Sequence, residues 1–326
     1  MGDCMNKKVV VLGGGTGMSS LLRGLKQFPF DITAVVSVCD DGASTGRLRK
    51  EFNIPAVGDI RKVLISLSET EPLFEKLLDY RFSTTSDLDG HAVGNLLLTA
   101  MANISGNMSD GIESIGKILN LKGNVLPLTE DNVTLIAKMK DGKVIEGEHF
   151  ITEYHGDIDT VYYKETPVVN EKVLDAIKNS DLIILSMGSI YTSILPNLLC
   201  KEVIEEIDKS KSKIIYACNM MTQPGETDHL SVSGHINILN KYLGEHKVNA
   251  VVANNGIISN YMIEKYSTLE QKDPVLIDYN ELKKLNVDLI EDDFVSIESD
   301  IIRHNATKLA LRIFSYLISW YLLLNK

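Results

Sequence analysis

Five short apolar runs constrain the fold of this 326-residue chain more than any other feature. Each run is rich in β-branched residues and is continuously apolar rather than alternating, which is typical of strands covered on both faces. Stretches of helical periodicity separate the runs, as in repeated strand–helix units. We therefore predict a Rossmann-like α/β fold, with a mainly parallel sheet and helices on both faces. The predicted strands span residues 8–12, 32–38, 182–185, 213–217 and 248–253.

The helical stretches complete this pattern, and Asp59 and Asp110 are expected to cap two of them. The last helix contains the most apolar segment, residues 309–324, which carries Arg312 and is too short for a confident membrane span. We expect it to be core or a homodimer interface. The predicted helices span residues 18–27, 59–68, 73–80, 94–104, 110–119, 171–178, 195–207, 231–243 and about 304–323.

The middle of the chain, residues 123–166, has a different pattern. It contains several short β-rich runs, and Asp141-Gly142 between two of them is a typical hairpin turn. No repeat or low-complexity linker marks a boundary. We predict one α/β nucleotide-binding domain over residues 1–326, with residues 123–166 as a small β-rich insertion within it.

Charge and cysteine content restrict the partners and the compartment. Lys and Arg total 33 against 44 Asp and Glu, a net charge of −11. Such an acidic chain is poorly suited to unspecific binding of nucleic acid or anionic membrane. Cys4, Cys39, Cys200 and Cys218 form no C-x-x-C pair, and no signal peptide is visible, so we expect free thiols in the cytoplasm.

A loop rich in glycine and polar residues follows each predicted strand directly. If the strands are parallel, all five loops lie along the same carboxyl edge, where open α/β sheets bind ligands. The sequence therefore predicts a single ligand site. The loops span residues 13–17, 39–47, 186–193, 219–227 and 254–256.

The first of these loops has the composition of a phosphate cradle. Glycines let backbone N–H groups approach an anion at the N-terminus of the following helix. The pattern is G-x-G-x-G; Met18 stands where G-x-G-x-x-G has its last glycine, and no lysine follows as in a P-loop. The predicted cradle residues are Gly13, Gly14, Gly15, Thr16 and Gly17.

Two acids follow the second strand. Asp40 comes 23 residues after Gly17, where an acid accepts hydrogen bonds from a ribose in dinucleotide-binding domains. Asp40 and Asp41 are the catalytic candidates if the protein is an enzyme, orienting a hydroxyl or a Mg²⁺ ion. Adjacent side chains of an extended strand end point to opposite sides. We expect Asp40 to face the site and Asp41 to fix the turn.

Other polar residues at helix starts and in the later loops complete the predicted ligand set. Arg61 is placed to clamp a phosphate, His91 to act as a donor, and the loop residues to donate to phosphate or sugar hydroxyls. The additional candidates are Arg61, His91, Asn95, Gly188, Ser189, Tyr191, Thr192, Asn219, Thr222 and Gly225.

Seven segments, in order, resemble the gluconeogenesis factor family (YvcK-like proteins), which lies in the CofD-like group with the 2-phospho-L-lactate transferases. The resemblance runs from about residue 8 to residue 311. Ala43 stands where that family commonly has a second glycine, and Met187 where it has proline. The segments are LGGGTGMSSLLRGLK, CDDGASTGRLR, GDIRKVL, GHAVGNLLL, SMGSIYTSILPNLL, CNMMTQPGET and IIRHNATKLA.

This resemblance implies a cytoplasmic protein that binds a nucleotide sugar such as a UDP-sugar. It also implies a role in growth on gluconeogenic carbon sources and in cell shape, with a regulatory protein partner that the sequence does not identify. Two alternatives stay open at this point. One is a CofD-like transferase that moves a phospholactyl-type group from a nucleoside diphosphate to an alcohol. The other is an NAD-binding enzyme.

Overall fold

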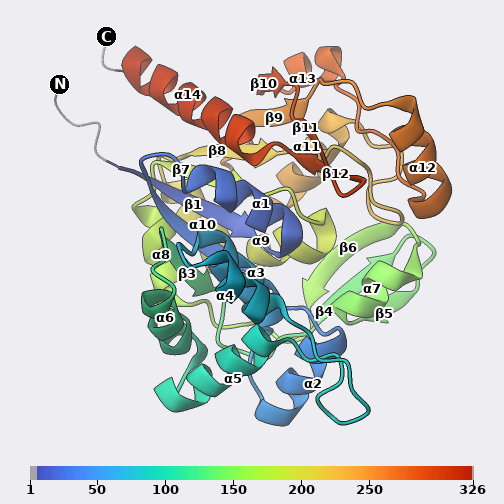
Figure 1. Cartoon of the computed structure of the whole chain (residues 1–326). Coiled ribbons are helices and arrows are strands. Elements are labelled where there is room, and N and C mark those ends of the chain that lie inside the picture. The colour runs from blue at the N-terminus through green and yellow to red at the C-terminus, as the bar shows by residue number, and fades with distance from the viewer. Residues whose placement is uncertain (1–5, 325–326) are drawn as a thin grey trace.

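The computed structural model describes residues 6–324 and contains a seven-stranded sheet at its centre (Figure 1). Every neighbouring pair of strands in this sheet is parallel, which confirms the predicted α/β class. Across the sheet the order is β10 (Asp288–Asp292), β9 (Ala250–Asn254), β8 (Lys213–Ala217), β7 (Leu182–Leu185), β1 (Lys7–Gly13), β2 (Phe30–Val36) and β3 (Asn124–Pro127).

The strand order reverses once, between β1 and β7. From β1 the chain builds outward through β2 to β3, then returns to the centre and builds the other half from β7 to β10. Open α/β sheets bind ligands where the strand order reverses, outside the carboxyl ends of the strands. The topology therefore places the expected site at the ends of β1 and β7.

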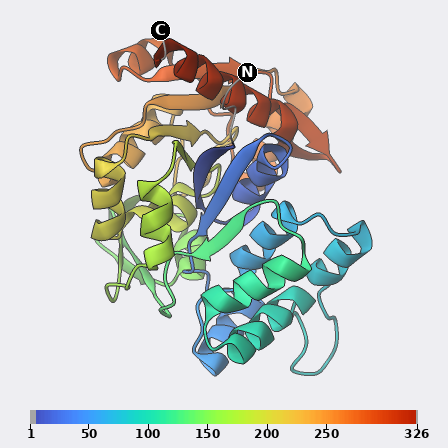
Figure 2. The same ribbon diagram turned by 90° about the vertical axis from the view of Figure 1, so that its left-hand side faces the viewer.

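Helices cover both faces of the sheet (Figure 2). Helix α1 packs against α3 and α14 on one side, and α8 packs against α10 on the other. The helices are α1 (Gly15–Leu25), α2 (Ala43–Phe52), α3 (Gly58–Leu67), α4 (Pro72–Asp79), α5 (Val93–Ser105), α6 (Met108–Ile118), α7 (Glu148–Tyr154), α8 (Glu171–Lys178), α9 (Leu195–Leu198), α10 (Lys201–Lys209), α11 (Val232–Tyr242), α12 (Asn260–Glu270), α13 (Tyr279–Lys284) and α14 (Ala306–Leu324), with a π-helix, η1 (Ile190–Ile194).

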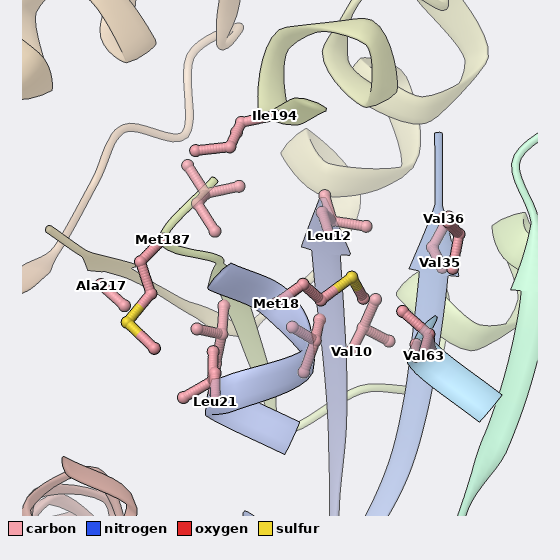
Figure 3. Packing of buried hydrophobic residues seen from close by; sticks show 14 of the residues in the cluster. Val10, Leu12, Met18, Leu21, Val35, Val36, Val63, Met187, Ile194 and Ala217 are labelled. Carbon is pink, nitrogen blue, oxygen red and sulfur yellow. The ribbon is translucent and has the colours of Figure 1, made fainter. Parts of the chain in front are cut away.

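The core lies between the central strands and the helices over them (Figure 3). Val10 and Leu12 of β1 point to the same side because side chains alternate along a strand, and Met18 and Leu21 of α1 pack there. All four side chains are almost fully buried. Each such burial contributes about 1.5–3 kcal/mol, so the strand–turn–helix unit that carries the glycine loop is held rigidly.

Two predicted helix caps are wrong. Helix α3 begins after Val57, and Asp59 lies within its first turn. Helix α6 is capped by Asn107, whose side-chain oxygen accepts the Asp110 N–H. In both cases the helix begins earlier than the apolar periodicity suggested, because its first turn carries few apolar side chains.

The β-rich middle segment divides between two sheets. Its first run forms β3, which pairs in parallel with β2 at the edge of the main sheet. The separate antiparallel sheet contains β4 (Leu135–Met139), β5 (Val144–Glu146) and β6 (Ile158–Tyr163) in the order β5-β4-β6, with α7 between β5 and β6. Gly142 has φ +88 in the turn between β4 and β5, as the Asp-Gly pair predicts. The assignment of residues 1–326 to a single domain stays a prediction.

The C-terminal part differs most from the prediction. Strand β10 and the hairpin of β11 (Val295–Glu298) and β12 (Ile301–His304) were not expected. The predicted helix over residues 195–207 is instead divided into α9 and α10, and the π-helix η1 precedes it. Helix α14 buries Leu309, Ile313 and Leu317 in the core, so this face is not free for a dimer contact. Within residues 6–324 no helix is long and apolar enough to cross a membrane.

Candidate functional site

A cleft of about 760 Å³ lies at the carboxyl edge of the sheet, at the point where the strand order reverses. Loops after β1, β2, β7 and β8 all contribute to it, so four of the five predicted loops meet in one place. The predicted ligand residues that line it are Gly14, Gly15, Thr16, Gly17, Asp40, Gly188, Ser189, Thr192, Asn219 and Thr222.

The glycine loop presents the first turn of α1 to this cleft. Gly15 has φ +69, a left-handed conformation that favours glycine, and a Cβ there would come no closer than 3.7 Å to the Asp59 carboxylate. No side chain caps α1 and its first turn holds no acid. The Asp59 carboxyl group lies beside this helix N-terminus, where the Gly15 N–H favours its ionised form and lowers its pKa against the larger effect of burial.

The flanking glycines serve packing. A Cβ on Gly17 would collide with the Met187 carbonyl oxygen, so Gly17 lets α1 approach the loop after β7. Gly13, predicted as a ligand residue, does not line the cleft; its carbonyl accepts the Ser37 N–H at 2.9 Å. A Cβ on Gly13 would collide with the Ser186 side chain.

The two adjacent acids point in different directions. Asp40 lines the cleft, and its Oδ1 accepts the Gly42 N–H at 3.0 Å. Asp41 does not line the cleft: its Oδ1 accepts the His149 N–H at 2.9 Å, at the start of α7. Asp41 is thus a positioning residue for α7, and this helix brings Glu148 into the cleft.

Several other predicted ligand residues lie elsewhere. The Arg61 guanidinium pairs with Asp79 and donates to the Leu78 carbonyl, so it is not free to clamp a phosphate. His91 Nδ1 lies 2.9 Å from Ser44 Oγ, and this buried hydroxyl also accepts from the Asn95 amide at 3.2 Å. Neither His91 nor Asn95 lines the cleft.

Tyr191 and Gly225 also do not line the cleft. The Tyr191 side chain is buried, and burial raises the pKa of its hydroxyl. Its backbone N–H lies 3.4 Å from the Glu226 carboxylate, which does line the cleft. Gly225 has φ +78 and packs against the backbone of His155 in the insertion. Both residues shape the cleft without facing it.

Sequence reasoning missed most of the charged lining. Asp59 was taken for a cap, Glu148 lies in no motif, and Glu226 lies in the CNMMTQPGET segment but was assigned no role. Arg303 and His304 lie in the late IIRHNATKLA segment, which supported the family resemblance but was assigned no role. The additional polar lining includes Asp59, Lys62, Glu148, Gln223, Glu226, Glu270, Lys272, Arg303 and His304.

Carboxylates dominate the electrostatics of the cleft. Burial, together with the nearby Asp40 charge, raises the pKa of Glu148 to about 7, although a hydrogen bond with Thr192 opposes this shift. Burial also raises the pKa of Glu226, against hydrogen bonds from Ser189 and the Tyr191 N–H. Burial raises the pKa of Asp59 as well, and the Lys62 ammonium at 3.0 Å opposes this shift.

One cation in the cleft lacks an acidic partner. Lys62 pairs with Asp59 at 3.0 Å, and Lys272 pairs with Glu270 at 2.6 Å. The Arg303 side chain lines the cleft from β12 and makes no ion pair or hydrogen bond with the residues from 6 to 324. An arginine in this state can bind a phosphate through two parallel hydrogen bonds.

The Mg²⁺ ion, named above only as one option for Asp40 in an enzyme, has no preformed ligand set in the part of the chain that the structure describes, where no group of three His, Cys, Asp or Glu side chains is close enough to hold a metal ion. His304 is also committed to a structural contact. Its Nε2 lies 3.2 Å from the Cys218 carbonyl oxygen, and burial lowers the pKa of the ring to about 4.

A larger groove of about 870 Å³ opens near the amino ends of β1, β2 and β3, away from the glycine loops. Two of its three cations are paired: Lys117 and Lys172 lie 2.9 Å and 3.5 Å from the Glu113 carboxylate, and the third is Lys8. The groove also carries the acids Asp31, Glu113 and Asp175, and the glycine loop does not contribute to it.

The fold and the cleft define a doubly wound α/β protein that binds its ligand at the switch point of a parallel sheet. A family described as 2-phospho-L-lactate transferase CofD matches residues 9–295, and the chain belongs to this CofD family, in its gluconeogenesis factor (YvcK-like) group. The Gluconeogenesis factor of Bacillus subtilis (strain 168) is 45% identical over 304 residues, covering 93% of this chain and 96% of that protein.

Further comparisons agree. The Gluconeogenesis factor of Halalkalibacterium halodurans is 44% identical over 306 residues, covering 93% of this chain and 94% of that protein. A crystal structure of a UPF0052 family member from Bacillus halodurans is similar with a TM-score of 0.91 and 43% identity, covering 94% of this chain and 99% of that one. The similarity covers nearly the whole chain.

Proposed function

We propose that this chain binds a nucleotide sugar such as a UDP-sugar in the cleft at the carboxyl edge. In this role it would act as a gluconeogenesis factor, needed for growth on gluconeogenic carbon sources and for cell shape. One observation carries the proposal: the N-terminus of α1 and Arg303, which has no side-chain partner among the described residues, share a cleft whose lining also includes hydroxyl, amide and carboxyl groups.

The first half of the cleft suits the diphosphate. Backbone amides at the N-terminus of α1 attract anions through their N–H groups and the helix dipole. The Asp59 carboxyl group now lies beside the Gly15 N–H, and a bound phosphate would take its place there. Arg303 adds the full positive charge that the loop lacks.

The second half suits a sugar. Ser189, Thr192 and Asn219 supply neutral donors and acceptors, and Glu148 and Glu226 supply carboxyl groups. Such groups recognise hydroxyls by paired hydrogen bonds, and their geometry gives specificity more than affinity. This division explains why a chain with net charge −11 can still hold an anionic ligand.

A transferase is the second candidate, because Asp40 faces the same cleft as the glycine loop. In that role Asp40 would orient an alcohol acceptor toward a nucleoside diphosphate donor, and a phospholactyl-type group would pass to the alcohol. The description of the family as a transferase family also supports this candidate. Release of a nucleotide that is lost in Asp40→Asn would favour it over a binding factor.

A thermal-shift panel tests the ligand class. A ligand that binds only the folded state stabilises it by about 2.7 kcal/mol at a hundredfold excess over Kd. We expect UDP-sugars to raise Tm, and GDP and NAD to have much smaller effects. A shift with NAD alone would favour the dinucleotide alternative, and a shift with GDP alone would favour the transferase.

The cytoplasmic location also belongs to this proposal. Cys39, Cys200 and Cys218 are buried free thiols, which suits a reducing compartment. Cys4 lies outside the described residues. A homodimer and a regulatory protein partner stay predictions.

A further inference from the structure

An apolar surface extends over α4, α5 and α6, which lie side by side (Figures 1 and 2). Its large side chains are exposed, among them Leu73 at 77% and Ile118 at 66% of their surface, and none of them lines the cleft at the carboxyl edge. We call this surface the helical face. Its exposed apolar residues are Leu73 and Leu77 on α4, Tyr80 directly after α4, Leu97 and Ile104 on α5, and Ile118 on α6.

The helical face has a ridge next to a hollow. Leu73 and Leu77 are four residues apart on α4 and so form a ridge along one side of this helix. A hollow of about 160 Å³ opens between α4, α5 and α6, and Ile118 lies at its edge. Phe74 lines both this hollow and a shallow groove beside the ridge, so the two features adjoin.

The hollow suits an apolar side chain. Arg61 is the one charged residue that lines it, and its guanidinium is paired with Asp79. The other side chains that line it are leucine, isoleucine, methionine and phenylalanine. An apolar cavity of about 150 Å³ holds a group the size of benzene, so this hollow has room for a leucine side chain from another surface.

The exposed apolar area of the helical face approaches that of an interface of standard size. The exposed fractions of its six apolar residues together equal about three and a half whole side chains. Burying a whole side chain removes on the order of 100 Å² from water, so the helical face offers roughly 350 Å². One partner in a standard interface buries about 800 Å², of which somewhat more than half is apolar. The helical face thus supplies most of the apolar area that a stable complex needs.

Charges of both signs border the ridge. Glu71 and Lys76 line the shallow groove together with Leu73 and Leu77. Neither charged side chain makes an ion pair or a hydrogen bond with the residues from 6 to 324. A partner that matches this face must therefore carry both a cation and an anion beside an apolar centre.

A second copy of the helical face meets each of these requirements. In a dimer with twofold symmetry both subunits use the same patch, so every contact occurs twice. The Leu73–Leu77 ridge of each copy can fill the hollow of the other, and Glu71 of each can pair with Lys76 of the other. The C-terminal helix α14, which was expected to form such an interface, instead buries its apolar side chains in the core.

We propose that two copies of this chain associate through the helical face, around a twofold axis. The helical face shares no residue with the cleft at the carboxyl edge, so the two subunits keep separate clefts. This dimer does not depend on which ligand the cleft binds.

Sedimentation equilibrium of the full chain between about 1 µM and 100 µM tests the proposal, because self-association depends on concentration. We expect the wild type to reach the mass of two chains within this range. Leu73→Asp on the ridge and Ile118→Asp at the hollow should each raise the Kd of the dimer more than about thirtyfold, since each replaces an apolar anchor by an unpaired carboxylate.

Leu276→Asp is the matched control. Leu276 is similarly exposed, at 70%, and lies outside the helical face and the cleft, so this variant should associate as the wild type does. Circular dichroism should show the same helix content in all variants, and Leu77→Ser is the milder ridge variant if Leu73→Asp does not fold. A monomeric wild type, a dimer that persists in either helical-face variant, or an equal loss in Leu276→Asp would overturn the proposal.

Discussion

Replacing Arg303 by glutamine should weaken binding of a UDP-sugar strongly without lowering the stability of the protein. The Arg303 side chain lines the cleft and makes no ion pair or hydrogen bond within the described chain. Its removal therefore breaks no interaction of the ligand-free fold. Glutamine keeps much of the length of the side chain and removes the charge and the two-pronged donor geometry.

The size of the effect follows from the bonds that the guanidinium can make. A hydrogen bond to a charged group contributes about 1.5–3 kcal/mol, and about 1.4 kcal/mol corresponds to a tenfold change in Kd. We therefore expect Kd to rise about 10- to 150-fold. The free energy of unfolding should change by less than about 0.5 kcal/mol, as for surface substitutions that break no contact.

Titration calorimetry at low and high salt measures the first quantity, and urea unfolding measures the second. The wild type should lose affinity with added salt more steeply than Arg303→Gln, because screening acts on the interaction between charges. Arg23→Gln, an exposed arginine on α1 outside the cleft, is the matched control and should bind as the wild type does. Wild-type affinity in Arg303→Gln would refute the role of Arg303 in holding the anion.

Four further substitutions separate binding from folding. Gly17→Ala should lower the urea midpoint of unfolding clearly, because its methyl group meets the Met187 carbonyl. Gly15→Ala should lower the free energy of unfolding by about 1–2 kcal/mol and mainly weaken ligand binding. Equal stability losses in the two variants would contradict this. Asp41→Ala should lower stability by about 1 kcal/mol through loss of the bond at the start of α7, and an unchanged urea midpoint would argue against that role. Folding raises the pKa of Glu148 from its ordinary 4.5 to about 7 and so favours the neutral acid. The stability of the wild type should therefore fall as the pH rises through this window, and Glu148→Gln should gain roughly 2–3 kcal/mol relative to the wild type between pH 4.5 and pH 8. A difference in unfolding free energy between the two that stays constant with pH would contradict this.

The parallel sheet and its functional edge could be predicted because both depend on local pattern. Strands buried on both faces require continuous apolar runs, and the loops after them must be polar to face a ligand. Strand β10 was missed for the same reason. It lies at the edge of the sheet, none of its residues is fully buried, and its sequence DLIED contains three acids.

Helix α2 shows a second limit of pattern reading. Its buried face includes Ser44, Thr45 and Arg49, so apolar periodicity does not reveal it. Arg49 is held by the carbonyl groups of Cys39 and Asp40 and by Asn132 of a later loop. These contacts depend on tertiary packing, which the sequence pattern does not contain.

The site residues divide in the same way. Glycines and hydroxyls at strand ends could be placed in the cleft because topology alone carries them there. Arg61 could not be placed, because its direction depends on Asp79 at the end of a neighbouring helix. Glu148 and Arg303 reach the cleft only through the insertion and the C-terminal hairpin, which lie far from the glycine loop in the sequence.

A crystal structure with UDP-glucose bound tests the central claim most directly. The account predicts density for the diphosphate at the backbone amides that begin α1, with Arg303 in contact with it and the sugar beside Thr192 and Asn219. Density in the larger groove at the amino ends of the strands, near Lys117 and Lys172, would contradict it.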